Sequence, residues 1–206
     1  MNYIIALSVF FLFASSGQIN KQHKKERPII DSHLTLNEAL KGKEIPKTNT
    51  KNLLLVDVEY YSFDNRLHRG QVVIHKDLAK DIIEIFALIK EKKFPVKKVI
   101  PVNYYRWSDE ASMKDNNTSA FNYRVINGTR TFSPHALGRA IDINPFLNPQ
   151  IKNGKIFPEG ATYNKNARGT ITSNSWLTHE FYKRGWRWGG NWRFTQDYQH
   201  FEKAKS

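Results

Sequence analysis

The chain has 206 residues and carries 32 Lys and Arg against 19 Asp and Glu, a formal net charge of +13. This length suits one well-cored domain and excludes two large ones. The absence of cysteine excludes disulfides, thiolate metal ligands and a cysteine nucleophile, so any metal must be held by His and carboxylate side chains. The positive charge favours a polyanionic partner such as nucleic acid, an anionic membrane or an anionic wall polymer.

The N-terminal segment has the pattern of an export signal. An apolar run from Ile4 to Ala14 is followed directly by small residues. The run is shorter than the roughly 20 apolar residues that span a bilayer. We therefore expect residues 1–20 to be a signal peptide, and the mature protein to be periplasmic or secreted without a stable membrane anchor. The alternative is a buried N-terminal helix or strand.

Residues 21–50 are expected to form a basic linker and a short N-terminal helix. Thr35 and Glu38 have the spacing of a capping box, and Gly42 supplies a stop, which predicts a helix over 36–41. The remaining residues, 51–206, are expected to form one catalytic domain.

The first half of this domain shows clear periodicities. Residues 53–63 and 71–75 are rich in β-branched and aromatic side chains and predict an antiparallel pair of strands. Apolar residues at helical spacing predict an amphipathic helix over 77–92. A strand is expected over 96–102, and the polar stretch 107–131 is expected to be a loop.

The second half alternates short elements with loops. Residues 140–143 predict a strand on which Asp142 faces away from the two isoleucines beside it. Residues 145–172 are expected to be rich in loops. Residues 175–184 predict a helix that ends at Gly185, and 199–202 predict a closing strand.

Seven histidines leave several candidates for chemistry. His179 and Glu180 begin like the helical zinc motif H-E-x-x-H, but the second histidine is absent, so His179 is interpreted as an ordinary surface or core residue. His75, at a predicted strand end, has the same interpretation.

His135 and Asp142 lie seven residues apart in SPHALGRAID. On a helix this spacing covers about 10.5 Å, and on one strand it sends the side chains to opposite faces, whereas metal bonds are about 2 Å long. Both residues can reach one ion only if the chain turns between them, and Gly138 is the residue suited to that turn.

A second polar pair, Asp197 and His200, stands in DYQHFE near the C-terminus. A strand position for His200 and a turn before the strand for Asp197 would let both reach one cavity. Two histidines and one aspartate that leave a fourth position open have the composition of a catalytic zinc centre, since structural zinc sites are closed by a fourth protein ligand.

The two motifs together carry a resemblance to a known family. S-x-H-x-x-G-x-A-x-D at 133–142, and D-x-x-H at 197–200 after G-W-x-W-G-G-x-W, resemble the D-alanyl-D-alanine carboxypeptidase family of zinc peptidases. The branch includes VanY-like carboxypeptidases and phage endolysins that cut L-alanyl-D-glutamate bonds. The loop 115–124 is also similar to this branch, and the similarity covers roughly 70–202.

The resemblance implies a fold, a metal and roles for individual residues. The fold would be a single α+β domain of hedgehog/DD-peptidase type, with helices packed on a small antiparallel sheet that carries the zinc ligands. His135, Asp142 and His200 would bind one Zn²⁺ ion, and Asp197 would be the general acid and base. Substrate-binding roles would fall to Ser133 and to Arg124 or Arg106; Arg124 is favoured because its loop leads into the first motif.

The resulting hypothesis is an exported zinc peptidase that hydrolyses peptide bonds in peptidoglycan stem peptides, as a carboxypeptidase or an endopeptidase. Its expected partners are peptidoglycan and, through surface charge, anionic wall polymer, and it is expected to be a monomer. One alternative is a non-catalytic, zinc-containing wall-binding module, against which the presence of Asp197 argues. A nucleic-acid-binding domain is disfavoured because the chain has a predicted signal and no recognisable nucleic-acid-reading motif.

Overall fold

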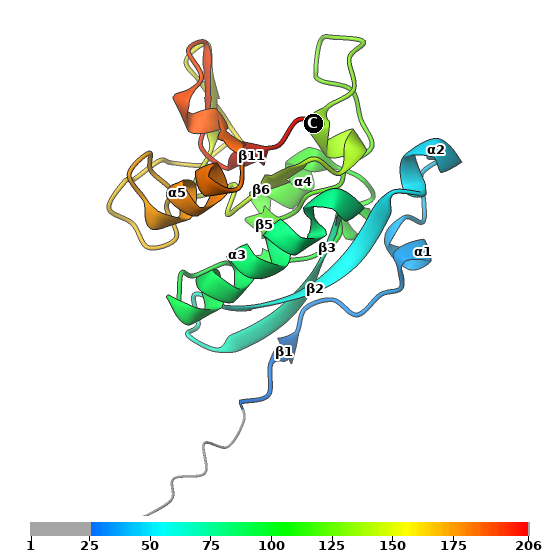
Figure 1. Ribbon diagram of the computed structural model, residues 1–206. Helices are drawn as coiled ribbons and strands as arrows, with labels where there is room; N and C mark the ends of the chain where they lie inside the picture. Colours follow the sequence, from blue (N-terminus) through cyan, green and yellow to red (C-terminus); the bar gives the residue numbers. More distant parts are fainter. Residues whose placement is uncertain (1–25, 206) are drawn as a thin grey trace, which may run out of the picture.

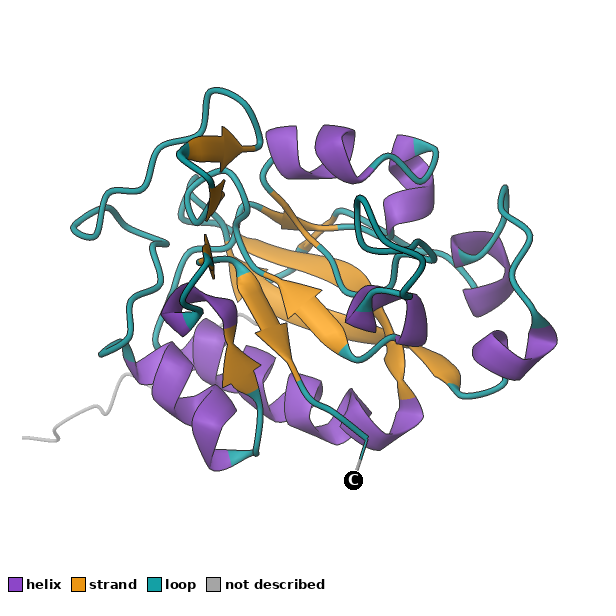
Figure 2. Cartoon of the chain, turned by 90° about the horizontal axis from the view of Figure 1, so that it is seen from above, coloured by secondary structure: helices purple, strands orange, loops and turns teal. Residues whose placement is uncertain are grey.

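The computed structural model describes residues 26–205, and it has the expected α+β architecture of one compact domain (Figure 1). The long strands lie in the middle of the molecule with helices around them, and several short strands lie nearer its edge (Figure 2). Within the described residues, no helix has the length and hydropathy that crossing a membrane requires. The expected signal peptide, residues 1–20, lies outside the described part of the chain.

A long hairpin and one helix form the base of the domain. Strands β2 (Leu53–Tyr61) and β3 (Leu67–His75) pair antiparallel, as predicted, although β3 begins four residues earlier than expected. The predicted amphipathic helix is present as α3 (Ala79–Glu91) after the 3-10 helix η1 (Lys76–Leu78), and it buries its apolar stripe on β2.

Residues 26–50, the described part of the segment expected to be a linker and short helix, are folded onto this base. The capping box of Thr35 and Glu38 is formed and opens α1 (Leu36–Ala39), and α2 (Lys47–Thr50) follows. Strand β1 (Ile29–Ile30) pairs parallel with β3. Apolar side chains of 34–45 pack against the outer side of the hairpin, so these residues are part of the domain's packing.

The stretch 96–131 differs from the expectation in two places. Only β4 (Lys98–Val99) is strand, because Pro101 starts the 3-10 helix η2 (Val102–Tyr105). The predicted loop contains α4 (Asp109–Lys114) and β5 (Asn117–Thr118), which pairs parallel with β4. The missed helix has the usual start signals, namely a Ser108 cap and acidic residues in its first turn.

A second sheet stands beside the base and carries Asp142 and His200, one residue from each motif. It has the order β6 (Ala140–Asp142), β11 (His200–Glu202), β9 (Arg187–Trp188), and all its pairs are antiparallel. Helix α5 (Trp176–Lys183) ends with Arg184 as its C-cap, and Gly185 follows with positive φ in the C′ position predicted for it. Ile141, Ile143 and Phe201 point into the same core as α3 and α5, which leaves the other face of β6 and β11 for polar side chains.

A third small sheet arises where loops were expected. Strands β7 (Gln150–Lys152) and β8 (Lys155–Phe157) form a hairpin, and β7 also pairs with β10 (Thr195–Asp197). Both turn residues, Asn153 and Gly154, have positive φ, which is the geometry that an Asn-Gly hairpin turn requires. Asp197 therefore ends a strand of its own and does not lie in a turn.

Candidate metal centre

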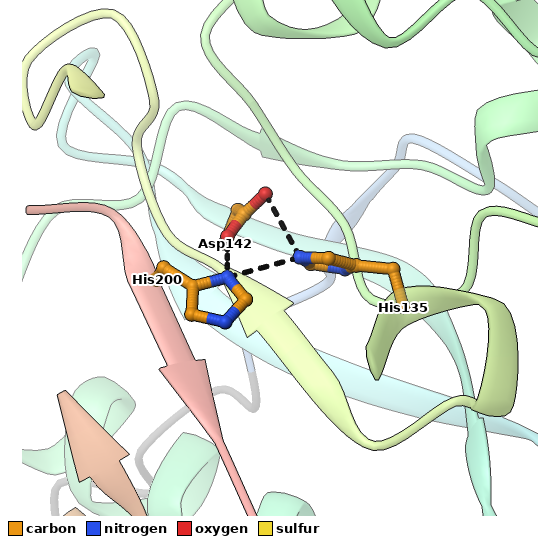
Figure 3. Close-up of side chains that lie close together, drawn as sticks. All are labelled: His135, Asp142 and His200. Carbon is orange, nitrogen blue, oxygen red and sulfur yellow. Dashed lines mark hydrogen bonds and ion pairs between the residues drawn. The ribbon is translucent and has the colours of Figure 1, made fainter. Parts of the chain in front are cut away.

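Three buried side chains from the two distant motifs converge on one point. His135, Asp142 and His200 are at most 8% exposed, and Figure 3 shows them pointing toward one another. His135 Nε2 lies 3.1 Å from His200 Nδ1 and 3.3 Å from Asp142 Oδ2, and His200 Nδ1 lies 3.0 Å from Asp142 Oδ1. Tetrahedral zinc with bonds of about 2.0–2.1 Å separates its ligand atoms by about 3.3 Å. The spacing thus fits one zinc ion.

The turn that brings His135 to this point is the one expected at Gly138. The 3-10 helix η3 (Pro134–Leu137) starts at Ser133, whose hydroxyl accepts a hydrogen bond from the His135 backbone N–H. Gly138 follows with φ +64°, and a Cβ there would lie 2.7 Å from Leu53 Cδ2 and 2.8 Å from the His75 backbone nitrogen. Only glycine satisfies both the left-handed conformation and the close approach.

Sheet register places the other two residues. Asp142 on β6 lies directly opposite His200 on β11. Opposite residues of an antiparallel pair project to the same face, so their side chains meet without further adjustment. Trp192 packs its ring 5.2 Å from that of His200 and covers one side of the cluster.

Hydrogen bonds at the outer edges of the two imidazoles determine which nitrogens face inward. His135 Nδ1 lies 2.5 Å from the Ala120 carbonyl oxygen, and His200 Nε2 lies 3.2 Å from Glu202 Oε2. Both oxygens only accept, so these nitrogens carry the protons. In neutral rings, His135 Nε2 and His200 Nδ1 then direct lone pairs at the Asp142 carboxylate. Two lone pairs and a carboxylate directed at one another repel. A cation must therefore lie between them, either a proton or a metal ion.

The pKa directions agree with this need for a cation. Burial would raise the pKa of Asp142, but the charges and hydrogen bonds of His135 and His200 outweigh it and hold that pKa far below its usual range. Burial would lower the pKa of His200, but hydrogen bonds to Asp142 and Glu202 outweigh it and raise the pKa to about 10. In the absence of metal, the cation is a proton on His200.

A fourth side chain, the carboxylate of Asp197, lines the same cavity. It is 7% exposed and lies across β10 and β7 from Gln150, whose side-chain N–H donates to Oδ2 at 2.6 Å. Its other oxygen, Oδ1, has no hydrogen-bond partner among the described residues. Burial raises the pKa of Asp197 to about 6, with His200 opposing the shift and Asp142 adding to it. Asp197 is therefore a carboxyl group able to exchange a proton near neutral pH.

The glycine pair in GWRWGGNW lets the backbone pack closely against Asp197 and His200. A Cβ on Gly189 would lie 2.8 Å from the Asp197 carbonyl oxygen and 3.3 Å from His200 Cβ. A Cβ on Gly190 would overlap the Trp188 ring at 2.3 Å. The 3-10 helix η4 (Gly189–Asn191) can thus lie directly against both motif residues.

These side chains line a cavity of about 440 Å³, a size typical of small-molecule sites. Arg124 and Ser133 also line it, while Arg106 is exposed and is not among the lining residues. Arg124 Nη2 pairs with Asp109 Oδ2 at 2.8 Å, so the unexpected helix α4 orients this guanidinium. The Ser133 hydroxyl is engaged in capping η3.

The remaining histidine candidates lie elsewhere. His179 is exposed on α5, and His75 forms its ion pair with Asp77 at 3.4 Å. Neither belongs to the cluster of His135, Asp142 and His200.

Comparison with known families supports the interpretation of the two motifs as parts of a peptidase. Residues 127–203 match the family model described as D-alanyl-D-alanine carboxypeptidase. This segment, which is less than half of the chain, is similar to that family. The resemblance inferred from the motifs is confirmed, and the match supports a peptidase of the carboxypeptidase type. The matched segment contains both motifs but does not include Arg124. Comparisons with curated proteins and with solved structures gave no match.

Two residues of the site were not found by sequence reasoning. Glu202 contacts the outer nitrogen of His200, and Gln150 holds Asp197. Glu202 had a signal, since it stands two residues after His200 and shares its strand face. Gln150 had none, because it follows from a pairing between β7 and β10 that only the folded chain reveals.

Proposed function

We propose that this protein is an exported zinc peptidase that hydrolyses peptide bonds in the stem peptides of peptidoglycan. The observation that carries the proposal is the convergence of His135, Asp142 and His200, at 3.0–3.3 Å from one another, in the same cavity as the carboxylate of Asp197. The family match supports the peptidase class, and the ligand geometry supports zinc.

His135 Nε2, His200 Nδ1 and an Asp142 oxygen would hold the ion and leave a fourth position toward the cavity. Zinc bound there supplies Lewis acidity, which polarises a substrate carbonyl and acidifies water. The three side chains supply the geometry, since each is buried and two are held at their outer nitrogens.

Asp197 would handle the protons. Its free Oδ1 would take a proton from the attacking water and later deliver it to the nitrogen of the departing amine, so one carboxyl group serves both steps. Gln150 would keep Oδ2 engaged and thereby orient Oδ1 toward the reacting atoms. A raised pKa suits this exchange, because the protonated and ionised forms are then close in energy near neutral pH.

Arg124 would hold the substrate. It lines the cavity and is aimed by Asp109, and a guanidinium can bind a peptide carboxylate or stabilise the developing oxyanion. Ser133 would act by fixing η3, the element that presents His135. Arg106 has no such position, because its side chain is exposed and does not line the cavity.

A non-catalytic wall-binding module with a retained metal site is the second candidate. A buried, partly unpaired carboxylate beside the ligands is costly for a protein that only binds. The presence of Asp197 with its raised pKa therefore favours the enzyme. The formal charge of +13 is suited to adhesion to anionic wall polymer in either case.

Digestion of purified peptidoglycan tests the proposed function. We expect zinc-loaded wild-type protein to release fragments with new termini in the stem peptide, which mass spectrometry identifies together with the bond cut. Two controls accompany it: chelated protein should release no fragments, and the Asp197→Asn variant should release them about 10²–10⁴-fold more slowly. Unchanged muropeptides after prolonged digestion with fully zinc-loaded protein would favour the binding module.

A further inference from the structure

We infer that Glu202 is a positioning residue for the metal site, which fixes the ring of His200 so that Nδ1 is the ligand atom. The inference rests on the proposed zinc site and concerns a residue outside the two motifs. The side chain of Glu202 is 12% exposed, so its carboxylate is largely removed from water.

The register of the second sheet builds a continuous chain of contacts. On β11, His200 and Glu202 project to one face, with Phe201 between them directed into the core. His200 lies opposite Asp142 on β6, and Glu202 lies opposite Arg187 on β9. The series of side-chain contacts therefore runs from Asp142 through His200 and Glu202 to Arg187.

The donor and the acceptor can be assigned in each of these side-chain contacts. Arg187 Nη2 donates to Glu202 Oε1 at 2.6 Å, which leaves Oε2 to accept from His200 Nε2 at 3.2 Å. A ring that donates at Nε2 can offer a lone pair only at Nδ1 when it is neutral. Glu202 contacts the nitrogen turned away from Asp142, so it acts on the metal site through His200 and does not itself belong to the ligand cluster.

The ring of His135 is also fixed by a hydrogen bond at its outer nitrogen, but its partner is a backbone carbonyl. Its Nδ1 donates to the backbone carbonyl of Ala120, which no side-chain substitution removes. The outer nitrogen of His200 depends on one side chain, so loss of Glu202 leaves packing against Trp192 and the contact with Asp142 to restrain χ2. Loss of an anchor of this kind typically weakens metal affinity or activity about 10–100-fold.

The experiment measures zinc affinity, by competition with a chromophoric chelator, for the full chain and four variants. We expect Glu202→Ala to bind zinc about 10–100-fold more weakly. Glu202→Gln retains a carbonyl oxygen that can accept from Nε2–H, so its loss should be smaller. Glu180→Gln, which disrupts an ion pair with Arg184 on α5, is the control and should bind as the wild type does.

Arg187→Met separates positioning of the ring from simple bracing of the sheet. It removes the ion pair that Arg187 forms with Glu202 but leaves the backbone pairing of β9 with β11 and the contact of Glu202 with His200, so zinc affinity should change much less than in Glu202→Ala. Nitrogen NMR of the zinc-loaded protein supplies a second readout: the Nε2–H of His200 should be protected from exchange in the wild type and not in Glu202→Ala.

Two results would overturn the inference: wild-type zinc affinity in Glu202→Ala, or an equal loss of affinity in Arg187→Met. A wild-type protein that binds no zinc would overturn it together with the proposed function. If the wild type binds zinc and Glu202→Ala weakens the binding, but no wall peptide is hydrolysed, the inference stands and only the proposed activity fails.

Discussion

Replacement of Asp197 by asparagine removes one ionisable group and little else. The amide has the same size, and its oxygen can still accept the hydrogen bond that Gln150 donates at 2.6 Å. None of the three proposed ligands is touched. The buried carboxylate, whose pKa burial raises to about 6, is exchanged for a neutral group, so the stability of the fold should not fall.

The expected effect on turnover is large. General acid–base assistance contributes about 10²–10⁴-fold in rate, or about 2.7–5.4 kcal/mol in the activation barrier. We expect kcat on a purified stem peptide to fall by this factor while zinc stoichiometry stays at one per chain. Asp197→Glu restores the charge with one more methylene and should recover part of the activity.

The competing account makes Asp197 a residue that only supports the metal site. Zinc affinity and turnover would then fall together, each by about 10–100-fold. Both quantities should be measured on the same preparation, with thermal melting as a check on the fold. Undiminished wall hydrolysis by Asp197→Asn would refute its assignment as the acid and base.

Three further predictions concern the substrate, the turn and the metal. Arg124→Gln should raise KM about 10-fold or more through loss of a charge-assisted hydrogen bond, while Arg106→Gln should leave KM unchanged; the opposite order would reverse the assignment. Gly138→Ala should lower the free energy of unfolding in urea by about 2–4 kcal/mol, from left-handed strain and steric overlap. Gly128→Ala, with positive φ but open space, should lower it less. Chelation should abolish activity but preserve the circular dichroism spectrum, since the apolar core does not include the ligands; global unfolding would indicate a structural metal site.

Much of the scaffold could be predicted because its signals are local. The capping box at Thr35, the apolar stripe of α3 and the glycine stop of α5 each depend on residues within a few positions of one another. The turn at Gly138 was deduced from chemistry, since no regular element lets His135 and Asp142 share an ion. The structure confirms the left-handed geometry there.

The missed features depend on pairing between distant segments or on weak local signals. The hairpin of β7 and β8 lies in a stretch whose composition predicts loops, although its Asn-Gly turn is a local signal for a hairpin. The strand position of Asp197 and the contact with Gln150 follow from pairing over 47 residues, which no local pattern reports. Helix α4 was hidden by the polar composition of its surroundings, yet it supplies the partner of Arg124.

The central claim is that His135, Asp142 and His200 hold one zinc ion, and anomalous X-ray diffraction at the zinc edge tests it at the level of atoms. Crystals of zinc-loaded protein should show one strong peak about 2.0–2.2 Å from His135 Nε2, His200 Nδ1 and an oxygen of Asp142. The absence of a peak at this position, or a peak held by another set of residues, would contradict the account.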